Sequence, residues 1–217
     1  MLFQNREEAA ELLAEKLSKY RGQNPLVLGI PRGAVPMARI IADALKGELD
    51  VVLVHKLGAP GNPEFAIGSV SENGHIYLNV AAKGWGVSQD YISRETKAQI
   101  ETLRRRRALY TPVRPAIDPL NRIVIVVDNG IATGATMIAA LRAIRAKHPA
   151  ELIGAVAVAP QETIERIAKE ADAVVCLEVP KEFYAVGEFF RDFSQVTDEE
   201  VIASLKQAPA RRKSHVL

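Results

Sequence analysis

The chain has 217 residues, of which 48% are hydrophobic and 25% are charged, and its formal net charge at pH 7 is +2. That length suits one α/β domain, and so small a charge excludes a surface that binds polyanions through charge alone. The single cysteine excludes an intrachain disulfide framework, and the four glutamates within residues 1–20 are typical of a soluble helix rather than a secretory leader. No apolar run approaches the roughly 20 residues of a membrane span. We therefore expect a cytoplasmic protein without membrane association.

The first part of the chain alternates helix and strand signals. Asn5 and Glu8 have the spacing of a helix capping box, and apolar residues at helical spacing follow them. Buried strands are predicted at residues 26–30 and 50–56, with a helix over 36–46 between them. This strand–helix–strand order favours a parallel sheet.

Residues 57–110 interrupt the alternation. The stretch "KLGAPGNPEFAIGS" is rich in glycine and proline, "GHIYLNV" predicts a short strand, and a charged helix is predicted from Ser88 to about Tyr110. Four consecutive arginines, Arg104–Arg107, lie in that helix. Because consecutive helical residues point in all directions, a solvated surface is the first interpretation, and a contact with phosphate or nucleic acid is the alternative.

The alternation resumes after a linker with three prolines. Strands are predicted at residues 122–128, 152–159 and 173–179, with helices after the first and second of them. An aromatic-rich segment follows, and then a last helix capped by Thr197. We therefore expect an open, mainly parallel sheet flanked by helices.

The stretch "IVIVVDNGIATGAT" (123–136) joins a buried strand to a loop of glycine and threonine that leads into a helix. In parallel sheets, ligands bind beyond the carboxyl ends of the strands. The glycines let backbone N–H groups approach a ligand, the threonines add hydroxyl donors, and the helix adds its dipole. The pattern favours a phosphate on residues 132–136 and sugar hydroxyls on Asp128. The alternative is an ordinary strand–helix turn in which Asp128 caps the helix.

The same stretch resembles the signature of type I phosphoribosyltransferases, in which an apolar strand and two acidic residues precede Thr-Gly-x-Thr. The resemblance extends from about residue 24 to 197, and the whole chain is similar to a branch of the family without an assigned acceptor. It implies one phosphoribosyltransferase-like α/β domain over residues 1–217, with a lid insert at 57–110 and a C-terminal hood segment at 180–197. It also implies a homodimer.

The resemblance further implies a site for phosphoribosyl pyrophosphate (PRPP). Asp128 would bind the ribose hydroxyls, and Asn129 replaces the family's second acid with an uncharged amide. Basic residues after the first two strands would bind the pyrophosphate. The implied PRPP-binding residues are Arg32, Gly33, Lys56, Asp128, Asn129, Gly130, Ile131, Ala132, Thr133, Gly134, Ala135 and Thr136. Mg²⁺ would be held largely by oxygens of PRPP, with Asp128 as an indirect ligand.

The implied reaction moves the 5-phosphoribosyl group from PRPP to a nitrogen acceptor, a nucleobase, and releases pyrophosphate. Arg32 and Lys56 would stabilise the leaving group, and Glu64 in the lid is the candidate general base. Tyr184, Phe189 and Phe190 are candidates for stacking on the acceptor, and closure of the core is their alternative role.

Two other functions stay open at this point. A non-catalytic regulator that senses PRPP and binds nucleic acid would explain Asn129 and the arginine run, although the small net charge and the lack of a DNA-binding motif disfavour nucleic acid as a partner. Another enzyme acting on a phosphosugar would use the same loop. The acceptor itself has no sequence signature.

Overall fold

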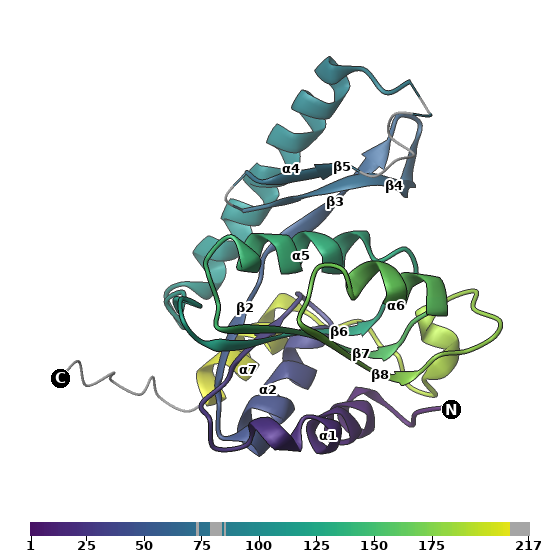
Figure 1. Cartoon of the computed structure of the whole chain (residues 1–217). Coiled ribbons are helices and arrows are strands. Elements are labelled where there is room, and N and C mark those ends of the chain that lie inside the picture. The colour runs from purple at the N-terminus through teal and green to yellow at the C-terminus, as the bar shows by residue number, and fades with distance from the viewer. Residues whose placement is uncertain (73, 79–83, 85, 209–217) are drawn as a thin grey trace.

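The main sheet is built from five parallel strands. The computed structural model describes the chain except residues 73, 79–83, 85 and 209–217 and the side chains of residues 63, 64 and 66. The strands lie in the order β2–β1–β6–β7–β8, and every neighbouring pair is parallel (Figure 1). Their bounds are Leu26–Gly29 for β1, Glu48–Val51 for β2, Ile123–Gly130 for β6, Glu151–Val158 for β7 and Ala173–Glu178 for β8. The open parallel sheet predicted from the sequence is confirmed.

Helices cover both faces of this sheet (Figure 1). On one face lie α1 (Arg6–Lys16), α2 (Ala34–Leu45) and α7 (Asp198–Gln207), and on the other lie α5 (Ala135–Arg145) and α6 (Gln161–Ile167). Two short 3₁₀ helices, η1 (Ser18–Tyr20) and η2 (Val186–Phe189), complete this part of the chain. Within the described residues, none of the helices has the length and apolar character needed to cross a membrane.

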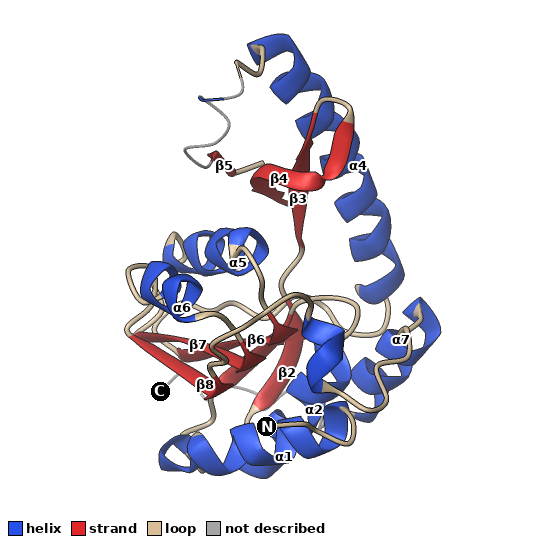
Figure 2. Ribbon diagram, turned by 90° about the vertical axis from the view of Figure 1, so that its right-hand side faces the viewer, coloured by secondary structure: helices blue, strands red, loops and turns tan. Residues whose placement is uncertain are grey.

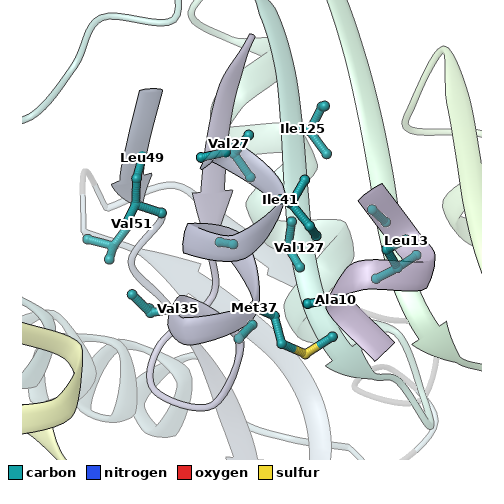
Figure 3. Packing of buried hydrophobic residues seen from close by; sticks show 14 of the residues in the cluster. Ala10, Leu13, Val27, Val35, Met37, Ile41, Leu49, Val51, Ile125 and Val127 are labelled. Carbon is teal, nitrogen blue, oxygen red and sulfur yellow. The ribbon is translucent and has the colours of Figure 1, made fainter. Parts of the chain in front are cut away.

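Alternate residues of the central strands enter two separate hydrophobic cores. Val27 of β1 and Ile125 of β6 pack with Ile41 of α2 and Leu13 of α1 (Figure 3). Val126 of β6 belongs to the second core, which the apolar face of α5 covers. Because successive strand residues point to opposite faces, a continuous apolar run is what a sheet covered on both sides requires.

The insert forms a second, antiparallel sheet. Its strands are β3 (Val54–Ala59), β4 (Asn62–Ser71) and β5 (Ile76–Leu78), and α4 (Gln89–Tyr110) packs against it. This sheet and α4 project together from the main sheet (Figure 2). The small sheet rests on α5, because the Ser69 hydroxyl donates to the Ala135 carbonyl at 3.2 Å and the Arg142 guanidinium lies 4.2 Å from the centre of the Tyr77 ring.

The single strand predicted at residues 50–56 is wrong, because two strands of different sheets share this stretch. β2 ends at Val51 in the main sheet, and β3 begins at Val54 in the small one. The run "DVVLVHK" is apolar throughout its centre. Residue types alone therefore carry no signal for the point at which the chain leaves one sheet and enters the next.

The arginine run divides into exposed and structural members. Arg104 and Arg105 are exposed. Arg107 instead donates two hydrogen bonds to the Glu72 carboxylate, at 2.8 and 2.7 Å, and its Nη1 lies 3.6 Å from Oδ1 of the buried Asp50 on β2. The solvated interpretation thus fails for Arg107, which joins α4 to the edge of the main sheet.

Candidate functional site

Two loops meet at the carboxyl ends of the central strands. β1 and β6 are parallel neighbours, and the chain after β1 stays in register because the Ile30 N–H donates to the Val127 carbonyl at 3.0 Å. The contact is close at Gly33, where an added Cβ would lie 2.5 Å from Nδ2 of Asn129. The loop after β1 and the loop after β6 therefore form one surface, as the ligand-binding edge of a parallel sheet requires.

The loop after β6 leads directly into α5. Gly134 has a φ of +74°, a backbone conformation that favours glycine, and it immediately precedes the helix. Ala132 and Thr133 are exposed. The first N–H groups of an α-helix have no partner within the helix, so this end of α5 suits an anion of phosphate size.

A side chain from α6 supports this loop from behind. The Thr163 hydroxyl donates to the Ala132 carbonyl at 2.6 Å and accepts a hydrogen bond from Arg166 at 2.9 Å. Thr163 is completely buried, and its methyl group would lie 3.0 Å from a Cβ added at Gly134. The sequence analysis missed Thr163, because a threonine in a predicted helix has no pattern that reports a contact with a distant loop.

Asp128 lies at the end of β6, with its carboxylate partly buried. Its Oδ1 accepts a hydrogen bond from the Asn129 N–H at 2.8 Å. Burial raises the pKa of Asp128 to about 7, although the Asn129 N–H and the Arg6 charge act in the opposite direction. In the free protein near neutral pH, this carboxyl group is therefore balanced between its protonated and ionised forms.

Arg6, the first residue of α1, reaches the neighbouring Asn129. Its Nε donates to Oδ1 of Asn129 at 3.1 Å, and its Nη1 donates to the Ser194 carbonyl at 2.8 Å. Its guanidinium carbon lies 4.0 Å from the centre of the Phe193 ring. The sequence analysis missed Arg6, since only the tertiary structure brings residue 6 to residue 129.

Arg32 lies in the loop after β1, beyond a cis peptide bond between Pro31 and Arg32. Its side chain is 38% exposed, and Nη1 lies 3.8 Å from Oδ2 of Asp198, the first residue of α7. The same carboxylate accepts a hydrogen bond from the Tyr110 hydroxyl at 2.6 Å. Arg32 therefore lies close enough to the two loops to contact a ligand bound between them. Its present partner, Asp198, is partly exposed, so Arg32 can exchange this partner for the ligand.

Lys56 lies in β3, directly opposite Ser69 of β4. Opposed residues of an antiparallel pair point to the same face of their sheet. Because the Ser69 hydroxyl contacts the first residue of α5, the half-buried Lys56 side chain is on the face turned towards that helix. The backbone of Glu64 belongs to β4, but its side chain lies outside the described residues, so its role as general base stays a prediction.

The three aromatic candidates have different surroundings. Phe190 is only 5% exposed and packs between Phe3 and Phe193, with ring centres 5.3 and 4.9 Å away. It therefore closes the core, as the alternative interpretation held, and is not free to stack on an acceptor. Phe189 stacks on Phe183 at 5.7 Å, and Tyr184 is 79% exposed.

A cavity of about 660 Å³ opens beyond the ends of β7 and β8. It is lined by Pro160, Gln161, Glu162, Glu165, Val179, Pro180, Lys181 and Phe183. The α6 residues that line it are exposed, whereas Thr163, which contacts the Ala132 carbonyl, is buried on another side of this helix. Phe183, which sequence analysis did not select, supplies its aromatic wall.

Protein ligands for a metal ion are few at this site. Among the described residues, no group of three or more histidine, cysteine, aspartate or glutamate side chains is placed to hold a metal ion. Asp128 offers a carboxylate with one oxygen already accepting from the backbone. This donor set fits a Mg²⁺ ion that a phosphorylated ligand supplies with most of its oxygen ligands, and it does not fit a site made by the protein alone.

The parallel sheet, the loops at its carboxyl edge and the start of α5 have the arrangement of an α/β domain with a candidate ligand site at one sheet edge. The family model of the phosphoribosyl transferase domain matches residues 1–193, and the chain belongs to this family. The fold is accordingly that of a type I phosphoribosyltransferase, with the additional sheet formed by the insert.

Similar proteins agree with this assignment. The crystal structure of TT1426 from Thermus thermophilus has 47% identity and a TM-score of 0.82, and the match covers 95% of this chain and 98% of that one. Two Mycobacterium tuberculosis proteins named as candidate phosphoribosyl transferases, MT0597 of strain CDC 1551 / Oshkosh and Rv0571c of strain ATCC 25618 / H37Rv, are 39% identical over 208 residues, or 95% of this chain. The chain spans 47% of the length of these two relatives.

Proposed function

We propose that this domain binds PRPP and transfers its 5-phosphoribosyl group to a nitrogen acceptor, a nucleobase, with release of pyrophosphate. The observation that carries the proposal is the contact between Gly33 and Asn129, which joins the loop after β1 to the end of β6, where the loop of residues 132–136 follows. A sugar that carries phosphate at one end and pyrophosphate at the other needs two such anion-binding loops on either side of a hydroxyl-binding carboxylate.

The donor is oriented by groups from the loops after β1 and β6 and from the strands β3 and β6. The 5′-phosphate binds the loop of residues 132–136 and the first N–H groups of α5. Asp128 accepts hydrogen bonds from the ribose hydroxyls, and the pyrophosphate lies towards Arg32, Gly33 and Lys56. Mg²⁺, bound mostly through oxygens of the donor, would neutralise part of the pyrophosphate charge.

The chemistry then depends mainly on positioning and charge. The acceptor nitrogen forms a bond with C1 of the sugar while the bond from C1 to pyrophosphate breaks, and the sugar carries positive charge in between. Arg32 and Lys56 stabilise the negative charge on the leaving group. Ionised Asp128 stabilises the sugar from the side of its hydroxyls. Glu64 remains our candidate for taking the proton from the acceptor.

The acceptor is best accommodated by the cavity beyond β7 and β8. It combines the Phe183 ring with carboxylates of Glu162 and Glu165 and the amino group of Lys181. An aromatic wall with a few polar groups suits a planar heterocycle. Tyr184 and Phe189 stay candidates for further contacts.

The insert and the C-terminal segment complete the proposal. Residues 57–110 act as a lid that excludes water from the donor, and residues 180–197 act as a hood over the acceptor. A homodimer in the cytoplasm stays our expectation. A nucleic-acid-binding regulator stays the alternative function, although Arg107 of the arginine run is engaged by Glu72 and Asp50.

Calorimetry of PRPP binding in the presence of Mg²⁺ tests the proposal. Wild type should bind PRPP, and Asp128→Ala should weaken binding at least tenfold through the loss of charge-assisted hydrogen bonds, each worth about 1.5–3 kcal/mol. The matched control is Asp43→Ala, since Asp43 is exposed near the C-terminal end of α2 and pairs with Arg39. A wild type that fails to bind PRPP contradicts the proposal. Pyrophosphate release with a panel of nucleobases then identifies the acceptor.

A further inference from the structure

Asn129 is held between two other elements of the donor site. Its Oδ1 accepts a hydrogen bond from Nε of Arg6 at 3.1 Å. Its Nδ2 lies against Gly33, where an added Cβ would be only 2.5 Å away. The side-chain amide thus spans the distance between α1 and the loop that the proposed function assigns to pyrophosphate.

The chemistry of arginine determines which way this amide points. A guanidinium group carries N–H donors and has no acceptor, so it must face the oxygen of Asn129 and not its NH₂ group. A flipped amide would place N–H against N–H next to Arg6 and would lose the hydrogen bond. With the oxygen turned towards Arg6, the NH₂ group is directed to Gly33.

Arg6 is itself held rigidly. Its Nη1 donates to the Ser194 carbonyl at 2.8 Å, and its guanidinium lies over the Phe193 ring at 4.0 Å. A side chain with three simultaneous partners loses little further conformational freedom when a ligand binds. The hydrogen bond from Arg6 to Asn129 is therefore already formed before the ligand binds.

We propose that Arg6 is a positioning residue of the donor site, which fixes Asn129 so that its amide N–H groups are directed to the pyrophosphate oxygens of PRPP. Asn129 then acts as a hydrogen-bond donor to the leaving group. Arg6 contacts the pyrophosphate side of the donor site only through this amide. This inference rests on the proposed function, because it assigns the polar partner that the loop at Gly33 presents to the donor.

A double-mutant cycle separates positioning from mere structural support. Arg6→Gln, Asn129→Leu and the double variant are titrated by calorimetry with PRPP and with inorganic pyrophosphate, each with and without Mg²⁺. Each single variant should weaken binding about tenfold, the size expected for one hydrogen bond to a charged group. The double variant should bind pyrophosphate, which has no ribose hydroxyls for Asp128, no more weakly than Asn129→Leu, because the amide through which Arg6 acts is then absent.

Asn129→Asp gives a second measurement. A purely structural role for Arg6 predicts no change in it. The carboxylate would still pair with Arg6, but it would present a negative oxygen towards Gly33 instead of N–H groups. Binding of pyrophosphate without Mg²⁺ should therefore fall further in Asn129→Asp than in Asn129→Leu. Binding with Mg²⁺ should recover in part, since the cation screens the two like charges.

Folding and general charge effects are controlled separately. Arg145→Gln removes an arginine that pairs with Asp172 near the far end of α5, and it should leave both affinities unchanged. Thermal unfolding identifies a variant that fails to fold, and Arg6→Lys, which keeps the charge but loses the planar donor group, then replaces Arg6→Gln in the cycle. The inference is overturned if the losses of binding free energy in the two single variants simply add in the double variant, or if Asn129→Asp binds as well as wild type. Either result leaves the proposed function intact. A wild type that binds neither PRPP nor pyrophosphate overturns the proposed function with it.

Discussion

The Thr163 hydroxyl donates a hydrogen bond of 2.6 Å to the carbonyl of Ala132, across 31 positions of the chain. This contact joins α6 to the loop that we assign to the 5′-phosphate. Because the Ala132 oxygen accepts this hydrogen bond from α6, we expect the carbonyl to face away from an anion bound by the loop. The conformation of this loop therefore depends on a side chain from a helix that is distant in the sequence.

Thr163→Val should weaken PRPP binding while leaving the shape of the core nearly unchanged. Valine keeps the volume but removes the hydroxyl, so the Ala132 carbonyl loses its partner at a cost of about 1–3 kcal/mol. We expect roughly a tenfold loss of PRPP affinity by calorimetry. Thr163→Ser, which keeps the hydroxyl, is the matched control and should bind within about threefold of wild type. Equal affinities of the two variants would show that the loop does not need this support.

Gly33→Ala should damage the donor site without unfolding the protein. The new Cβ would lie 2.5 Å from Nδ2 and 3.3 Å from Cγ of Asn129, so either the loop or the amide must move. We expect a loss of PRPP affinity of at least tenfold, with a destabilisation of about 1–3 kcal/mol, typical of overpacking. Gly84→Ala is the control, since a Cβ added there meets no atom of the described residues within 4 Å. Normal PRPP binding by Gly33→Ala would argue against the close contact of the two loops.

Asp128 should make the free protein less stable as the pH rises. Its pKa is raised from 3.8 to about 7 by folding, so the folded state holds the proton more tightly than the unfolded state. Stability from this group is full below about pH 4 and is lost progressively as the pH rises through about 7. Asp128→Asn does not titrate, so its free energy of unfolding should rise by about 1–3 kcal/mol relative to wild type between pH 4 and pH 8. Each pKa unit corresponds to 1.36 kcal/mol, and the expected gain is reduced because the residue is only partly buried.

Urea unfolding of both proteins without ligand, at several pH values, measures this difference. A constant difference between them across the range would contradict the raised pKa. PRPP affinity should show the opposite trend. In wild type it should increase relative to Asp128→Asn as the pH passes about 7, because the ionised carboxylate is the stronger acceptor of ribose hydroxyls. The ionisation of PRPP itself is common to both proteins and cancels in the comparison.

Arg107→Gln should destabilise the fold far more than Arg104→Gln. The loss of Arg107 leaves the carboxylates of Asp50 and Glu72 without their shared cation, and removing one partner of a buried ion pair costs about 3–5 kcal/mol. Arg104 is exposed, so its substitution should change stability by less than about 0.5 kcal/mol. Urea unfolding at pH 7 measures both.

The deficit of Arg107→Gln should shrink at acid pH. Burial already raises the pKa of Asp50, and without the arginine this carboxylate takes up a proton more readily as the pH falls. Similar stability of the two arginine variants at pH 7 would mean that the network between α4 and β2 contributes little.

Much of the fold could be predicted from the sequence because its signals are local. The strand over residues 123–130 and the glycine and threonine that follow it specify their own backbone conformation, and Gly134 adopts the positive φ that its residue type allows. Thr197 caps α7 as predicted, since the cap and its partner Glu200 are three residues apart. The boundary between β2 and β3 was missed because it depends on which sheet each strand joins.

The sequence by itself determined the alternation of strands and helices in the main sheet, its parallel character and the position of the loop after β6. These follow from hydrophobic periodicity and from backbone preferences, which act over a few residues. Only the tertiary structure decided that Arg6 reaches Asn129, that Thr163 supports Ala132 and that Phe190 belongs to the core. Such contacts join residues far apart in the chain, and their energies depend on distances and burial that exist only once the helices have packed on the sheet.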